Sequence, residues 1–252
     1  MNFTKSVFPK ITNELINYLS KPSIISNELT SYQTDIVEWL SPIIDLSNYK
    51  VYPTNGITEG LNWWMSHEKR QIVYSPGDYE WVDKKNQHQS ECILYMSNPS
   101  SIDGNFKTIP THIPVALDLA YIGSTAMPNK IHIPDNVEFV FYSLSKSFGL
   151  GNVRTGWIFT KRIEPKLHKL IYRHSYYNHY AHQIAEKSIM EFPIDYSYRI
   201  FKHEQERVCH YYDLTPSDCV WLATSNNVNM YNKFKRNDNI SRLCITGEFN
   251  DI

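Results

Sequence analysis

The stretch Ser143-Leu144-Ser145-Lys146 is followed by Ser147-Phe148-Gly149-Leu150-Gly151 and then by Asn152-Val153-Arg154-Thr155-Gly156-Trp157. It places one lysine between two serine hydroxyls, ahead of a glycine-rich segment and an arginine eight residues further on. A lysine amine can bond covalently to an aldehyde, and hydroxyls and a guanidinium suit a phosphate. The stretch therefore predicts a site for a small molecule that carries both an aldehyde and a phosphate.

The composition is that of a globular protein with room for a hydrophobic core, at 252 residues and 42% hydrophobic. Its formal net charge of -1 gives no electrostatic reason to expect nucleic acid or an anionic membrane as a partner. No stretch approaches the ~18 consecutive apolar residues of a membrane span. The amino-terminal residues 1–6 lack the apolar run of a signal peptide.

The four cysteines, Cys92, Cys209, Cys219 and Cys244, have no metal-ligand spacing, so we expect reduced thiols in a cytoplasmic protein. His174, His179 and His182 lie five and three residues apart, and a regular helix would not bring all three onto one face. We therefore expect no metal site.

Short apolar runs alternate with loops that hold polar or glycine residues. They predict strands over residues 50–53, 71–74, 92–96, 115–119, 139–142 and 156–159. Helical spacing occurs over residues 12–19, 30–40 and 60–67, and a long helix is predicted over residues 164–192. The tail favours a strand over residues 219–223, a helix over residues 230–235 and a strand over residues 242–246.

This rhythm predicts an α/β fold, with a mainly parallel central sheet, helices on both faces and a small C-terminal α/β subdomain. We divide the chain into a helical segment (1–50), a large domain (51–200) and the small subdomain (201–252). In such a fold, ligands bind beyond the carboxyl ends of the parallel strands.

Pyridoxal 5′-phosphate (PLP) carries an aldehyde, a phosphate and a pyridine ring, and polar residues at the predicted strand ends suit that ring. Asp118 ends an apolar run, and Tyr121 follows three residues later. The ring accepts electrons when its nitrogen is protonated, and a buried carboxylate holds that proton. The Tyr121 hydroxyl and the Asn98 amide can both bond the ring's phenolate oxygen. The turn at Asn55-Gly56, which opens a predicted helix, offers backbone N–H groups to a phosphate.

Taken in order along the chain, these motifs resemble those of the class I/II aminotransferases of fold type I, which use PLP. The resemblance covers residues 29–246, in a chain shorter than is usual for the family. It implies that Lys146 binds PLP covalently and moves a proton, with Asp118 and Tyr121 as further catalytic residues. The phosphate ligands that it implies are Gly56, Ile57, Thr58, Ser143, Ser145 and Arg154.

The resemblance also implies the remaining contacts of the site. Tyr79 would stack on the pyridine ring, with Trp81 as the alternative. Arg242 would bind the substrate carboxylate beside Asn98, with Arg173 as the next candidate. The family transfers amino groups between amino acids and 2-oxo acids, as homodimers whose subunits share active sites, and we expect the same here.

Other interpretations stay open. The same site could support decarboxylation or another reaction at the α-carbon, because the loops decide which bond is broken. A non-catalytic PLP-binding module is a further alternative, although binding alone does not need the lysine as a base. Each motif alone also fits a turn or a strand end. Their common order from Gly56 to Gly156 favours the cofactor site.

Overall fold

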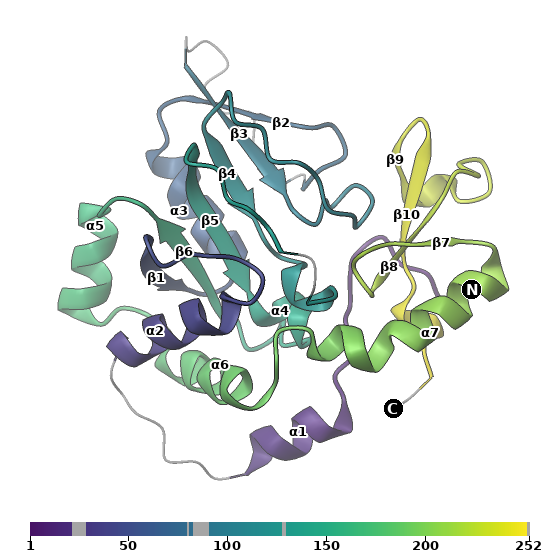
Figure 1. Cartoon of the computed structure of the whole chain (residues 1–252), viewed down its shortest axis with the longest axis horizontal. Coiled ribbons are helices and arrows are strands. Elements are labelled where there is room, and N and C mark those ends of the chain that lie inside the picture. The colour runs from purple at the N-terminus through teal and green to yellow at the C-terminus, as the bar shows by residue number, and fades with distance from the viewer. Residues whose placement is uncertain (22–28, 80, 83–90, 128–129, 251–252) are drawn as a thin grey trace.

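A six-stranded sheet forms the centre of the computed structural model, which describes residues 1–21, 29–79, 81–82, 91–127 and 130–250 (Figure 1). The strand order is β1-β6-β5-β4-β3-β2. Strands β2 to β5 pair in parallel, and β6 is antiparallel to both β5 and β1. The predicted, mainly parallel sheet is therefore confirmed. The strands are β1 Lys50–Thr54, β2 Gln71–Tyr74, β3 Cys92–Ser97, β4 Val115–Asp118, β5 Val137–Ser143 and β6 Gly156–Thr160.

Helices cover both faces of this sheet, because its strands bury alternate side chains on opposite sides. Leu117 and Val140 belong to one hydrophobic layer, with residues of α1, α2 and α6. Ala116 and Phe141 belong to the other, with residues of α3 and α5. This arrangement confirms the predicted α/β fold class. The helices are α1 Asn13–Ser20, α2 Leu29–Leu40, α3 Ile57–His67, α5 Pro165–His168 and α6 His179–Glu191.

A smaller antiparallel sheet, ordered β7-β8-β10-β9, forms a second unit with helix α7 and has its own hydrophobic cluster. The amino-terminal residues join it: Thr4 and Cys244 exchange backbone hydrogen bonds of 3.2 and 3.0 Å (Figure 1). The start of the chain therefore packs against its last strand. The elements are α7 Tyr196–Tyr212, β7 Thr215–Pro216, β8 Leu222–Ser225, β9 Lys235–Asn237 and β10 Ile240–Cys244.

The helix predicted over residues 164–192 is wrong as one element. It is broken into α5, a π-helical turn η2 (Lys169–Arg173) and α6. Ser175 has a φ of 49°, a left-handed conformation that ends the helix. Asn178 then begins α6, because its side chain accepts a hydrogen bond from the Ala181 amide at 3.0 Å.

One prediction for the tail also differs from the structure, and one helix was missed. The helix expected over residues 230–235 is a short 3-10 turn, η3 (Asn232–Phe234), followed by β9. Helix α7 was not predicted, and it runs through residue 200, where the division into domains was placed. Its inner face holds the buried polar residues Glu204 and Gln205, so its apolar spacing is weak.

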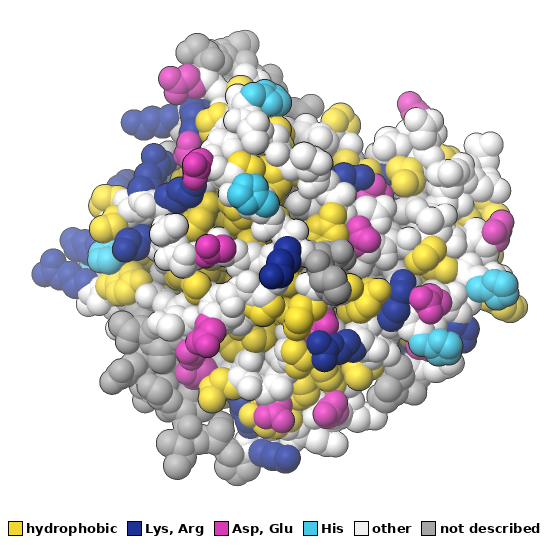
Figure 2. All heavy atoms as spheres, in the orientation of Figure 1, with side chains coloured by type: hydrophobic (Ala, Val, Ile, Leu, Met, Phe, Trp, Pro, Cys, Tyr) yellow, Lys and Arg dark blue, Asp and Glu magenta, His cyan; other side chains and the backbone are white. Residues whose placement is uncertain are grey.

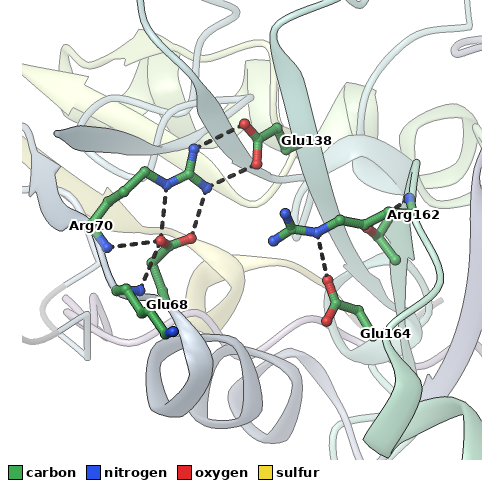
Figure 3. A network of polar contacts seen from close by, with 7 residues as sticks. Glu68, Arg70, Glu138, Arg162 and Glu164 are labelled. Carbon is green, nitrogen blue, oxygen red and sulfur yellow. Dashed lines mark hydrogen bonds and ion pairs between the residues drawn. The ribbon is translucent and has the colours of Figure 1, made fainter.

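An ionic network ties the end of α3 to the sheet, at the amino ends of the parallel strands (Figure 3). Arg70, just before β2, donates to Glu138 on β5 at 2.9 and 2.8 Å, and to Glu68 at the end of α3. Arg162 and Glu164 pair beside it at 2.8 Å. The network lies at the end of the strands opposite to the predicted site.

Candidate active site

One cavity of about 500 Å³ brings most of the predicted site residues together. It lies beyond the carboxyl ends of β3, β4 and β5, and is closed by the amino-terminal segment and by β9 and β10. A site beyond strand ends is the expected position in an open α/β sheet. The predicted residues that line it are Ile57, Thr58, Tyr79, Asp118, Tyr121, Ser143, Ser145, Lys146, Arg154 and Arg242.

Lys146 lies on α4 (Leu144–Ser147), a single helical turn directly after β5. Its Nζ donates to the carbonyl oxygen of Val7 at 2.6 Å, and the backbone carbonyl of Lys146 accepts from Trp221 Nε1 at 2.7 Å. Burial lowers the pKa of Lys146, because an ammonium loses hydration there. A larger fraction of this lysine is therefore the neutral amine, which is the form that attacks an aldehyde.

Asp118 ends β4 with only 3% of its surface exposed. Its Oδ2 accepts from the Tyr95 hydroxyl at 2.7 Å, and its Oδ1 accepts from the Ala120 amide at 2.8 Å. Burial raises the pKa of Asp118 to about 6. Above that pH the group is a carboxylate at the cavity wall, where it can pair with a cationic ring nitrogen.

The side of the cavity that holds the predicted phosphate ligands depends on a close approach of two loops. Gly56 has a φ of 85° and precedes α3, and Arg154 crosses it to donate to the Asn55 carbonyl at 2.9 Å. The φ of Gly56 is one that residues with a Cβ rarely adopt, and a Cβ there would lie 2.5 Å from Arg154 Nη2, so both features favour glycine. Gly56 therefore makes room for Arg154 and does not line the cavity itself. Ile57 and Thr58, at the α3 amino terminus, do line it.

Arg242, on β10, is 3% exposed. Its Nη1 donates to the Ser101 carbonyl at 2.8 Å, and its Nη2 donates to the Lys5 carbonyl at 2.5 Å. Its Nε has no hydrogen-bond partner, and no carboxylate of the described residues forms an ion pair with it. A buried guanidinium without a counter-ion is suited to an anionic group of a ligand.

Asn98 and Trp81 lie outside the cavity lining. The Asn98 amide exchanges two 3.0 Å hydrogen bonds with the backbone of Lys107, so it holds its own loop. Trp81 is half exposed and donates to Asn62 Oδ1 at 2.8 Å, whereas Tyr79 lines the cavity. This placement favours Tyr79 over Trp81 for contact with a ligand.

Arg173 lines a separate, shallower groove beside α5 and η2, together with His168, Lys169 and Tyr172. Lys and Arg side chains gather at this edge in Figure 2, whereas both signs of charge are interspersed over most of that face. Arg173 is therefore not part of the cavity that holds Arg242.

Within the described chain, no group of three or more His, Cys, Asp or Glu could hold a metal ion, and no helix is long and apolar enough to cross a membrane.

Several lining residues were missed by sequence reasoning. Ser97 ends β3 and Ser101 lies in the loop after it, and both hydroxyls donate to the buried carboxylate of Asp78. Ser97 could have been predicted, because it is a polar residue at the end of a predicted strand, where ligands bind in this fold. No local pattern marks Arg236 or the segment Lys5–Val7, which reach the cavity only because the two ends of the chain meet.

The fold is that of the solved PLP-dependent aminotransferases, as the resemblance predicted. An aromatic aminotransferase from Pyrococcus horikoshii matches with a TM-score of 0.71 and 10% identity over 96% of this chain and 89% of that one. A histidinol-phosphate aminotransferase from Clostridium acetobutylicum gives 0.65 and 12%, over 95% and 92%. A PLP-bound C-S lyase from Staphylococcus hominis gives 0.62 and 11%, over 95% and 84%. No family model and no curated protein matches the sequence.

Proposed function

We propose that this protein is a PLP-dependent aminotransferase that moves an amino group between an amino acid and a 2-oxo acid. One observation carries the proposal: Lys146, Asp118, Arg154 and Arg242, from four separate segments, line the same cavity. Structures described as aminotransferases share the fold, which supports the same assignment.

The residues present fit PLP. The cavity of about 500 Å³ has the size of a small-molecule site, and Gly56 leaves the space into which Arg154 extends. Arg154, Thr58, Ser143 and Ser145 supply donors for the phosphate. When bound, PLP supplies an aldehyde that condenses with amines, and a protonated ring that accepts the electron pair of the substrate α-carbon.

The protein's own groups would orient the ring. The carboxylate of Asp118 would hold the proton on the ring nitrogen, as its burial at the cavity wall allows. Tyr121 lines the same cavity, and its hydroxyl would donate to the ring's phenolate oxygen. Tyr79 would cover one face of the ring. Asn98 acts on the ring only indirectly in this account, through the loop that it holds.

Lys146 would bind the cofactor covalently at rest and act as the general base in turnover. Once the substrate amine has replaced it, its Nζ would take the proton from the substrate α-carbon and deliver it to C4′ of the cofactor. The burial that lowers the pKa of Lys146 favours this role, because a base must be neutral before it accepts a proton.

Arg242 would bind the substrate carboxylate. A guanidinium can donate two parallel hydrogen bonds to a carboxylate, and Arg242 Nε has no partner. Arg242 Nη2 donates to the Lys5 carbonyl, so the substrate would share or replace that backbone contact.

A screen of single amino acids tests this function. An aminotransferase loaded with PLP converts to the pyridoxamine phosphate form and releases one 2-oxo acid for each amino acid consumed. Release of carbon dioxide would indicate the decarboxylase alternative, and the absence of any change with every amino acid would indicate a binding module. Either result contradicts the proposal.

We also propose a homodimer in which the subunits share active sites. Exposed apolar side chains gather in the stretch from Ile163 to Tyr180, where Tyr176 and Tyr180 are 67% and 74% exposed. Such side chains suit a protein interface. Sedimentation equilibrium would test it, and a monomer at micromolar concentration contradicts it.

The four free cysteines fit a reducing compartment, and we propose the cytoplasm.

A further inference from the structure

Behind Asp118 lies a second buried group to which sequence analysis gave no role. Tyr95, on β3, has no exposed surface, and its hydroxyl donates to Asp118 Oδ2 at 2.7 Å. In the β3–β4 register, Tyr95 is opposite Ala116, so Asp118 is its diagonal neighbour, within reach of a tyrosine ring. Trp64 stacks beside the Tyr95 ring, with 6.5 Å between the ring centres. Packing therefore holds the hydroxyl in place.

The direction of this hydrogen bond matters. Burial raises the pKa of Tyr95 well above its ordinary value, so the phenol keeps its proton and donates it. A hydroxyl that donates to a carboxylate stabilises the charged form of that carboxylate. With the Ala120 amide on Oδ1, each oxygen of Asp118 accepts one hydrogen bond from the protein.

A second carboxylate opposes this effect. Asp78, in the loop after β2, is 3% exposed and lies near enough for its charge to raise the pKa of Asp118. The other ionisable groups around Asp118 are those that line the same cavity: Lys5, Tyr79, Tyr121, Lys146, Arg154, Arg236 and Arg242. Burial and Asp78 therefore favour the neutral acid, whereas Tyr95 favours the carboxylate.

We propose that Tyr95 is a positioning residue for Asp118: its hydroxyl keeps Asp118 an oriented carboxylate, so that the proton shared with the cofactor stays on the ring nitrogen. The inference rests on the proposed function. Without the hydroxyl, Asp118 becomes a stronger base, and the shared proton moves toward its oxygen. The ring then becomes a weaker electron acceptor, although Lys146 and the phosphate contacts are untouched.

The test is the pH dependence of PLP affinity in Tyr95→Phe, which removes one oxygen atom. Equilibrium dialysis between pH 5 and 9 gives the dissociation constant. In the parent protein, affinity falls as Asp118 takes up a proton near pH 6. In Tyr95→Phe, the fall begins about one pH unit higher, because the loss of a hydrogen bond to a carboxylate raises the pKa of that group by about one unit. The cofactor phosphate titrates near pH 6 in both proteins, so the difference is the readout.

Tyr49→Phe is the matched control. Tyr49 is also buried, and its hydroxyl donates to the Val137 carbonyl at 2.9 Å, at the far end of β5. We expect a similar loss of stability and no change in the pH profile of PLP binding.

Asp78→Asn gives a test of opposite sign, because it removes the charge that opposes Asp118 ionisation. Its fall in affinity should begin at lower pH than in the parent protein.

With ¹⁵N-labelled PLP bound to Tyr95→Phe, the ring nitrogen resonance should move toward that of neutral pyridine.

An unchanged profile and an unchanged nitrogen resonance in Tyr95→Phe would overturn the inference and leave the proposed function intact. If Tyr95→Phe does not fold, an unchanged profile in Asp78→Asn overturns it. Failure of the parent protein to bind PLP at any pH would instead overturn the proposed function.

Discussion

The cavity has two walls of different origin. The sheet wall (Thr58, Asp118, Ser143, Lys146 and Arg154) consists of residues at the ends of strands of the central sheet, or in the helices and loops next to those strands. The terminal wall (Lys5, Ser6, Val7, Arg236 and Arg242) forms where the two ends of the chain meet.

The sheet fixes the positions of the first wall, whereas backbone contacts such as Arg242 to Lys5 hold the second. We infer that the sheet wall determines cofactor chemistry and the terminal wall determines substrate affinity. Substitutions in the two walls should therefore have different kinetic effects.

The largest effect is expected for Lys146→Ala in the sheet wall. It removes both the covalent attachment and the proton carrier, so turnover should fall by several orders of magnitude. PLP should still bind, through Asp118 and Arg154. Single-turnover kinetics measures the loss, and Lys161→Ala, an exposed lysine that lies outside the cavity, is the control. Substantial turnover in Lys146→Ala would mean that another group moves the proton.

Asp118→Asn should come next. An amide does not hold the ring proton as a carboxylate does, so kcat should fall about 10³-fold, on the order of 4 kcal/mol. Covalent attachment to Lys146 should persist and can be followed by absorbance. Turnover near that of the parent protein would reduce Asp118 to a strand-end residue that accepts the Tyr95 and Ala120 bonds.

In the terminal wall, Arg242→Lys should weaken amino acid binding about 10-fold, or roughly 1.4 kcal/mol, and leave PLP affinity unchanged. A lysine cannot reproduce two parallel hydrogen bonds. Titration with amino acids and with amines that lack a carboxylate separates the effects, because only the amino acids should bind more weakly. Arg173→Lys, in the separate groove, should change neither. Equal losses for both ligand types would contradict a carboxylate contact at Arg242.

The smallest effect on function is expected far from both walls. Arg70→Gln removes the ion pairs to Glu68 and Glu138, both at 2.8 Å, and should cost about 1 kcal/mol of unfolding free energy. Because this network lies at the amino ends of the strands, PLP affinity should not change. Urea unfolding beside PLP titration tests both statements. A weaker PLP complex would show that the network also orders the sheet wall.

The same contrast explains what the sequence could predict. Strand β2 was predicted with its observed bounds, Gln71–Tyr74, because apolar runs between turns are local signals. Asp118, Lys146 and Arg154 were found because each lies at or near a strand end, with a recognisable neighbourhood. Their presence around one cavity follows from the parallel order of the sheet, although their roles stay predictions.

Long-range contacts set the limit. Gln205 on α7 is fully buried, and its amide donates to the carbonyls of Ser217, Cys219 and Leu222 at 2.8 to 3.0 Å. Because this buried position holds a polar residue, the apolar spacing that would predict helix α7, which packs on the second sheet, is interrupted. Lys5 and Val7 reach the cavity through pairing with the last strand, and no local pattern encodes it.

Chemical trapping tests the central claim most directly. The purified protein is incubated with PLP, reduced with borohydride, digested and mapped by mass spectrometry. The account predicts that the reduced cofactor lies on the peptide that contains Lys146, and that prior addition of a reactive amino acid lowers its yield. Reduced cofactor on another lysine, or on none, would contradict the assignment of this cavity as a PLP site.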